Sequence, residues 1–173
     1  MIKKQVILKT IIYAICATIL FVQETLLSVI PNFQFTTLLI VLFFNMFGFK
    51  ATTLIIITHV ILDNIWMQSL NLIYTPAMFL GWFSLPLILK LIPKRKNYFD
   101  IALIGAFHGV LYSFFFVLAQ VFLTQVDIMA YLIADIPFTL ILMMSNFITI
   151  LWLYQPLYTR LKPLYDEMIN KYN

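Results

Sequence analysis

One apolar stretch, residues 127–156, constrains this chain most, because it is long enough to cross a lipid bilayer and yet contains a carboxylic acid. A spanning helix needs about 20 mostly apolar residues. Asp135 lies about 12 Å along such a helix from Asp127, at roughly 1.5 Å per residue. It also comes two residues before Pro137. A charge at that depth costs several kcal/mol unless it faces protein or water. The sequence therefore predicts that Asp135 faces the interior of a helix bundle.

Further polar residues continue along the same predicted face. Tyr131, Asp135 and Thr139 are four residues apart, and Asn146 follows Asp135 by about three helical turns. Such a stripe has two interpretations. It is either a buried polar contact that holds helices together, or a ligand or translocation site, because ionisable groups inside membranes mark functional sites by default.

The composition places the whole chain in a membrane. Of its 173 residues, 63% are hydrophobic and only 10% are charged, whereas soluble domains average about 45–50% apolar and about 25% charged residues. The length allows one membrane domain and no soluble enzyme domain beside it. The lone Cys16 excludes a disulfide within the chain, and no Cys/His cluster indicates a metal site or a cofactor. Residues 1–22 resemble a signal peptide but have no convincing cleavage site, so we expect a retained first span.

The apolar segments predict an all-α integral membrane protein, a single bundle of six transmembrane helices. The predicted spans are residues 6–22, 35–48, 51–67, 73–91, 98–122 and 128–155, followed by a short surface helix in the tail, 157–173. Cytoplasmic loops are enriched in Lys and Arg. With both termini in the cytoplasm, every basic residue of the chain falls on that side: Lys3, Lys4, Lys9, Lys50, Lys90, Lys94, Arg95, Lys96, Arg160, Lys162 and Lys171. We expect a multi-pass protein of the bacterial plasma membrane. Nucleic acid is not an expected partner, because the basic residues flank apolar spans.

The opposite, outward half of the predicted bundle has the features of a small-molecule site. It contains the acids Glu24, Asp63, Asp127 and Asp135 and no Lys or Arg. Small-ligand pockets combine aromatic walls with a few convergent polar groups. The candidate substrate-binding residues are Asn32, Gln34, His59, Asp63, Asn64, Trp66, Tyr74, His108, Tyr112, Gln120, Tyr131 and Asp135.

Each of these candidates also has a structural explanation. Trp and Tyr gather at any membrane interface, and a lone histidine within a span is often a satisfied structural group. His59 and Asp63 are four residues apart and share a helical face, as do His108 and Tyr112. If the acids do face a ligand, a purely anionic molecule would meet them without compensation. The sequence therefore favours a neutral or cationic ligand.

No enzyme motif is present. The chain has no Gly-x-Ser-Gly serine motif and no His-Glu-x-x-His zinc motif, so we predict that it is not an enzyme. It also has no phosphate-binding loop, so transport driven by ATP would need another subunit to hydrolyse the nucleotide.

Small residues repeat along the first span. Thr10, Ala14 and Thr18 are four residues apart, with Ala17 beside them. Small residues at this spacing let another helix approach closely, so these four are the candidate residues for contact with a partner protein.

Taken together, the small-residue first span and several later segments resemble one family. These segments are residues 26–40 (Leu-Leu-Ser-Val-Ile-Pro-Asn-Phe-Gln-Phe-Thr-Thr-Leu-Leu-Ile), 47–50 (Phe-Gly-Phe-Lys), 62–64 (Leu-Asp-Asn), 74–76 with 81–82, and 134–138 (Ala-Asp-Ile-Pro-Phe). The chain resembles the substrate-binding S components of energy-coupling factor (ECF) vitamin transporters from about residue 6 to residue 158.

This resemblance implies a six-helix bundle that captures a vitamin or related micronutrient at its outer face. It also implies two kinds of partner, a membrane T component and two cytoplasmic ATPases. In that family an Ala-x-x-x-Ala pattern on the first helix meets the T component, whereas here the four-spaced set is Thr10, Ala14 and Thr18.

The alternative function is structural. Rod-shape-determining membrane scaffolds of the cell-wall machinery are also small, apolar and poor in charge, and they need no ligand. The outward set of acids, amides and aromatics is what separates the two hypotheses, because a scaffold does not require it.

Overall fold

A computed structural model of the chain describes residues 4–68, 70–92 and 97–171. This described part contains six α-helices and no β-strand. The helices are α1 (Lys4–Leu27), α2 (Thr36–Phe47), α3 (Phe49–Trp66), α4 (Tyr74–Leu91), α5 (Tyr98–Thr124) and α6 (Ile128–Asn170). The prediction of an all-α fold is confirmed.

Five of the described helices, all except α2, are long and apolar enough to cross a membrane. Large apolar side chains lie on the outward surfaces of these helices, as lipid requires: Trp152, Phe122 and Phe107 are 72%, 68% and 66% exposed. These features fit a multi-pass protein embedded in a membrane.

The exception, α2, is a short central helix. Its 12 residues span about 18 Å at 1.5 Å per residue, less than the roughly 30 Å hydrocarbon core of a bilayer. It packs against α1, α3, α4 and α6, and most of its side chains are buried. The helix therefore lies inside the bundle, which explains why a short segment can be so apolar.

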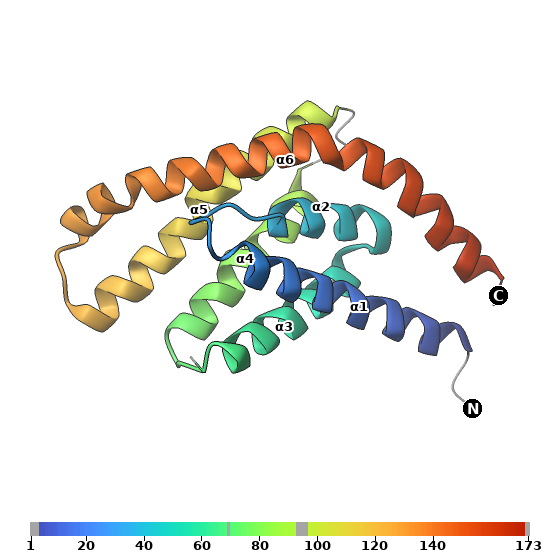
Figure 1. Cartoon of the computed structure of the whole chain (residues 1–173), viewed down its shortest axis with the longest axis horizontal. Helices are drawn as coiled ribbons and strands as arrows, with labels where there is room; N and C mark the ends of the chain where they lie inside the picture. The colour runs from blue at the N-terminus through green and yellow to red at the C-terminus, as the bar shows by residue number, and fades with distance from the viewer. Residues whose placement is uncertain (1–3, 69, 93–96, 172–173) are drawn as a thin grey trace.

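The core of the bundle surrounds α2. Trp82 and Leu85 of α4, Leu20 of α1 and Ile56 of α3 are 0% exposed and belong to one hydrophobic cluster with α2. Outside this core, α5 and the first part of α6 pack mainly on each other and extend together beyond the other helices (Figure 1). We use the name α5–α6 arm for α5 together with residues 128–145 of α6.

The last helix, α6, continues through 43 residues and includes Pro137, Pro156 and Pro163. Figure 1 shows that it changes direction part-way along, as a helix does where a proline removes a backbone hydrogen bond. The predicted tail, 157–173, is therefore a continuation of α6 as far as Asn170 rather than a separate short helix, and its last two residues lie outside the described part.

Both ends of the chain lie at the same end of the molecule (Figure 1). The described basic residues lie near the start of α1, at the α2–α3 junction, near the end of α4 and in the last part of α6. Lys90, at the end of α4, lies over the ring of Phe49 at the start of α3, 4.6 Å from its centroid. Lys3 and the basic segment 93–96 lie outside the described residues.

Candidate ligand-binding site

The outer ends of several helices enclose a cavity of about 420 Å³. Its walls come from the end of α1, the α1–α2 loop, the end of α3, the start of α4 and the second half of α5. The volume falls within the range of small-molecule sites, about 300–1,000 Å³. Seven of the predicted site residues line this outer cavity: Asn32, Gln34, Asp63, Asn64, Trp66, Tyr74 and Tyr112.

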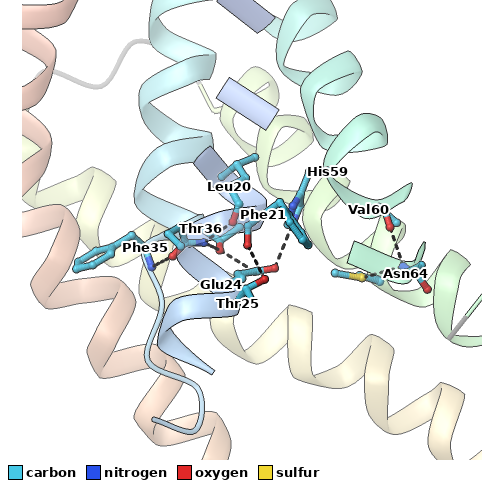
Figure 2. Close-up of polar contacts among 11 residues, drawn as sticks. Leu20, Phe21, Glu24, Thr25, Phe35, Thr36, His59, Val60 and Asn64 are labelled. Atoms are coloured by element: carbon cyan, nitrogen blue, oxygen red, sulfur yellow. Dashed lines mark hydrogen bonds and ion pairs between the residues drawn. The ribbon is translucent and has the colours of Figure 1, made fainter. Parts of the chain in front are cut away.

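The base of the outer cavity is a charged contact between α1 and α3, shown in Figure 2. Glu24 Oε2 lies 3.2 Å from Nε2 of His59, which is an ion pair when His59 is protonated. The His59 side chain is fully buried, and that of Glu24 is 14% exposed. The other carboxylate oxygen, Oε1, accepts a hydrogen bond of 2.7 Å from the hydroxyl of Thr36, the first residue of α2 (Figure 2).

Gln23 fixes the turn between α1 and α2 beside this contact. Its side-chain oxygen accepts a hydrogen bond of 2.9 Å from the backbone N–H of Phe35. Its side-chain nitrogen donates to the hydroxyl of Thr36 and to the carbonyl of Leu20. The polar stretch that ends the first span therefore holds the start of α2 in place, and with it the Glu24 carboxylate.

Asp63 lines the outer cavity one helical turn beyond His59 and is 5% exposed. It interacts electrostatically with Glu24, a like charge, and with His59. Within the described part of the chain, however, no hydrogen bond reaches its carboxylate. A buried acid ordinarily has hydrogen-bond partners, so the exception is informative.

Asn64, the next residue, shows the contrast. Its side-chain nitrogen donates to the carbonyl of Val60, 2.8 Å away, and lies 3.3 Å from the sulfur of Met78. Its side-chain oxygen accepts from the hydroxyl of Thr75 at 2.7 Å. The protein thus satisfies both ends of this amide, and Asn64 ties α3 to α4 in the cavity wall.

Aromatic rings line the same cavity as Asp63. Tyr112 and Phe116 of α5 lie with their ring centroids 4.8 Å apart, and Tyr74 lies 6.4 Å from Phe116. Gly81 of α4 allows this arrangement, because a Cβ atom at that position would lie 2.7 Å from the Tyr112 ring.

The α1–α2 loop closes the cavity from the side of α6. Asn32 adopts a left-handed backbone conformation, with φ of 56°, and its side chain donates to the carbonyl of Phe138, 2.9 Å away. The hydroxyl of Ser145 lies 3.3 Å from the backbone nitrogen of Gln34 and 3.4 Å from its carbonyl oxygen. The loop is therefore attached to the α5–α6 arm at two points.

Five of the predicted site residues do not line the cavity: His59, His108, Gln120, Tyr131 and Asp135. His59 lies at its base against Glu24. His108 is fully buried, with Nε2 3.0 Å from the carbonyl of Gly81, and packs against the rings of Trp82 and Tyr112. It supports the aromatic wall from behind.

Asp135 lies on the α5–α6 arm. It is half-buried, and the hydroxyl of Thr139 donates to its carboxylate at 2.7 Å. The polar stripe predicted from Tyr131 to Asn146 is therefore divided. Asn146 is fully buried and donates to the carbonyl of Gly105, whereas Asp135 remains near the surface with a partner on its own helix.

Glu24 lines the cavity but was not among the predicted substrate-binding residues. It was counted among the outward acids, but its pairing with His59 joins two helices across 35 positions, and no spacing within one helix reveals such a contact. Phe33, Met78 and Phe116 were missed for the same reason, since apolar residues of a cavity wall resemble those of a core.

The four predicted partner-contact residues of α1 divide into two groups. Thr10, Ala14 and Thr18 are exposed on the outside of the bundle, and both threonine hydroxyls bond to carbonyls of α1 itself. Ala17 is fully buried in the core. A second, mostly apolar groove of about 640 Å³ runs between α1, α2 and the last part of α6.

The described residues contain no group of three or more His, Cys, Asp or Glu side chains that could hold a metal ion. No protein-family model, curated protein or solved structure matches the chain. What the geometry offers chemically is a binding site, with a buried acid, an aromatic wall and a loop at its mouth.

Proposed function

We propose that this protein is a substrate-binding subunit of the ECF S-component type, which captures a vitamin or related micronutrient from outside the cell. One observation carries the proposal: within the described structure, the outer cavity is lined both by a buried acid without a hydrogen-bond partner and by aromatic rings. Unpaired buried acids cost free energy. A bound ligand that interacts with the Asp63 carboxylate would offset this cost.

In this proposal the chain spans the bacterial plasma membrane six times, with both termini in the cytoplasm. The basic residues support this orientation, because on α1, α3 and α4 they lie toward the helix ends opposite those that line the cavity. The short α2, held within the bundle, would count as the second span. The outer cavity would then face the medium from which a nutrient arrives.

The subunit delivers its cargo to a membrane T component that two cytoplasmic ATPases energise. Thr10, Ala14 and Thr18 support this part of the proposal, because they form an exposed strip of small residues on which a partner helix can lie closely. The scaffold hypothesis gains no comparable support, since a scaffold needs neither an unpaired buried acid nor a cavity beside it.

Ligand-dependent stabilisation of the purified, full-length protein tests the proposal. A vitamin or precursor present at 100 times its dissociation constant adds about 2.7 kcal/mol to the stability of the folded state. We expect at least one member of a panel of water-soluble vitamins and precursors to raise the melting temperature.

Two tryptophan variants serve as a matched pair in this experiment. Ser28→Trp places a large ring at the cavity mouth, whereas Phe107→Trp changes an exposed position of α5 away from the cavity. Stabilisation should disappear only in Ser28→Trp. A panel without any stabilising member, or equal stabilisation of both variants, would contradict the proposal.

A further inference from the structure

The charges around the outer cavity do not balance. Glu24 has two partners, since Thr36 donates to one carboxylate oxygen and His59 lies 3.2 Å from the other. Asp63, 5% exposed, has neither a hydrogen-bond donor nor a cation of its own in the described structure. Two acids share one histidine, so the cluster keeps a net negative charge even when His59 is protonated.

The rest of the cavity does not correct this imbalance. Its lining residues in the described chain include no Lys and no Arg. The amide of the neighbouring residue, Asn64, already donates to the carbonyl of Val60. A cation that would neutralise this cluster is therefore absent from the described lining of the cavity.

We propose that the ligand carries a positively charged nitrogen and that Asp63 is its counter-ion. This inference rests on the proposed function and names the chemical class of the substrate: a small organic cation with a planar or aromatic portion. A cation beside Asp63 would gain a charge-assisted interaction in a site largely removed from water.

The aromatic wall suits the same class of molecule. Tyr112, Phe116 and Tyr74 line the cavity from α5 and α4, and Asp63 lines it from the end of α3. The faces of such rings attract cations and stack on planar groups. An anionic ligand would instead meet Glu24 and Asp63 with no basic residue on any wall.

Three probes of nearly equal size and different charge separate the possibilities: 1-methylnicotinamide (cation), nicotinamide (neutral) and nicotinate (anion). Their affinities for the purified full chain would be measured by equilibrium dialysis in detergent at millimolar concentrations. We expect the cation to bind at least tenfold more tightly than the anion, which is about 1.4 kcal/mol, with the neutral probe between them.

Two variants locate the charge. Asp63→Asn should abolish the preference for the cation, while Asp63→Glu should keep it. Asp135→Asn is the matched control, because it removes an acid from the α5–α6 arm outside the cavity lining, and the preference should be unchanged. Melting temperature and elution volume in the absence of ligand show which variants are folded.

The wild-type comparison decides the inference even if Asp63→Asn does not fold. Equal affinities for the three probes, no binding of any of them, or a preference for nicotinate would overturn it. A folded Asp63→Asn variant that still prefers the cation would overturn it as well.

Failure of the proposed function gives a different result. A cation preference that depends on Asp63, without stabilisation by any vitamin or precursor, would leave the charge inference standing and remove the transport role. Stabilisation by an anionic vitamin, with no preference for the cationic probe, would do the opposite.

Discussion

Asp63 and Asp135 are two acids on predicted spanning helices, and the bundle treats them differently. Asp63 lies at the end of α3, where α1, α4 and α5 close around a cavity, and it is 5% exposed without a hydrogen bond in the described structure. Asp135 lies on the α5–α6 arm, half-buried, and bonds to Thr139 on its own helix. In the sequence, both acids lie within predominantly apolar segments.

The difference comes from what packs against each helix. The first part of α6 packs mainly on α5. Ile133 and Ile136, which flank Asp135 in the sequence, remain 63% and 52% exposed. An acid there needs only one local partner. The end of α3 is surrounded by several helices, so the carboxylate of Asp63 is largely shielded from water. The number of helices packed around each acid, rather than its position along an apolar segment, therefore distinguishes Asp63, which lines the cavity, from Asp135, which does not.

The largest expected effect is a loss of transport, caused by a change in the middle of α1, away from the end of that helix that lines the cavity. Ala14→Trp puts a large ring on the exposed strip and should reduce nutrient uptake in cells to background, because a partner helix could no longer approach closely. Ligand binding by the purified variant should be unchanged, since Ala14 does not line the cavity. Phe107→Trp, at an exposed site on α5, should transport normally. Normal uptake by Ala14→Trp, or loss of binding together with uptake, would refute the docking assignment.

The next largest effect compares the stability of the two acidic regions. His59→Ala leaves Glu24 without its imidazole partner and should lower the free energy of unfolding by about 3 kcal/mol, as expected when a buried pair is broken. Asp135→Ala removes one local hydrogen bond and should cost less than about 1 kcal/mol. Unfolding by denaturing detergent in mixed micelles measures both. Equal losses would mean that the two regions are equivalent after all.

Thr36 and Thr37 sharpen the comparison at the base of the cavity. Both are fully buried, but the Thr36 hydroxyl donates to Glu24, whereas the Thr37 hydroxyl has no partner in the described structure. Thr36→Val should cost about 2 kcal/mol, because it removes a hydrogen bond to a charged group. Thr37→Val should be neutral or slightly stabilising, since no bond is lost. The same unfolding measurement applies, and a larger loss in Thr37→Val would contradict the assigned hydrogen bonds.

The smallest expected effect concerns the link between the two regions. Asn32→Gly keeps the left-handed backbone of the loop and removes its hydrogen bond to Phe138 on the arm. At about 1 kcal/mol for the bond, ligand should dissociate roughly fivefold faster, which stopped-flow measurement can detect. An unchanged dissociation rate would show that the loop does not restrain the ligand.

Much of the fold could be predicted from the sequence, because an apolar segment long enough to cross a membrane forms a helix there. The segments predicted at 73–91 and 98–122 correspond closely to α4 and α5. The central position of α2 and the continuation of α6 through Pro156 could not be predicted, because both depend on contacts with other helices rather than on local pattern.

The site was predictable where its geometry is local. His59 and Asp63 share a face of α3, and the sequence placed both near the outer end. The pairing of His59 with Glu24 rather than with Asp63 is a tertiary contact between α1 and α3, and it decides which acid is left unpaired. Asp135 shows the opposite limit, since it also lies within a predicted span but on a part of α6 that the bundle leaves half-exposed.

Native mass spectrometry of the protein after incubation with the vitamin panel tests the central claim most directly, that the outer cavity built around Asp63 is a ligand site. The wild type and Asp135→Asn should both retain one small molecule of the same mass, and Asp63→Asn should retain at least tenfold less. Equal retention by all three proteins, or no bound molecule on the wild type, would contradict the account.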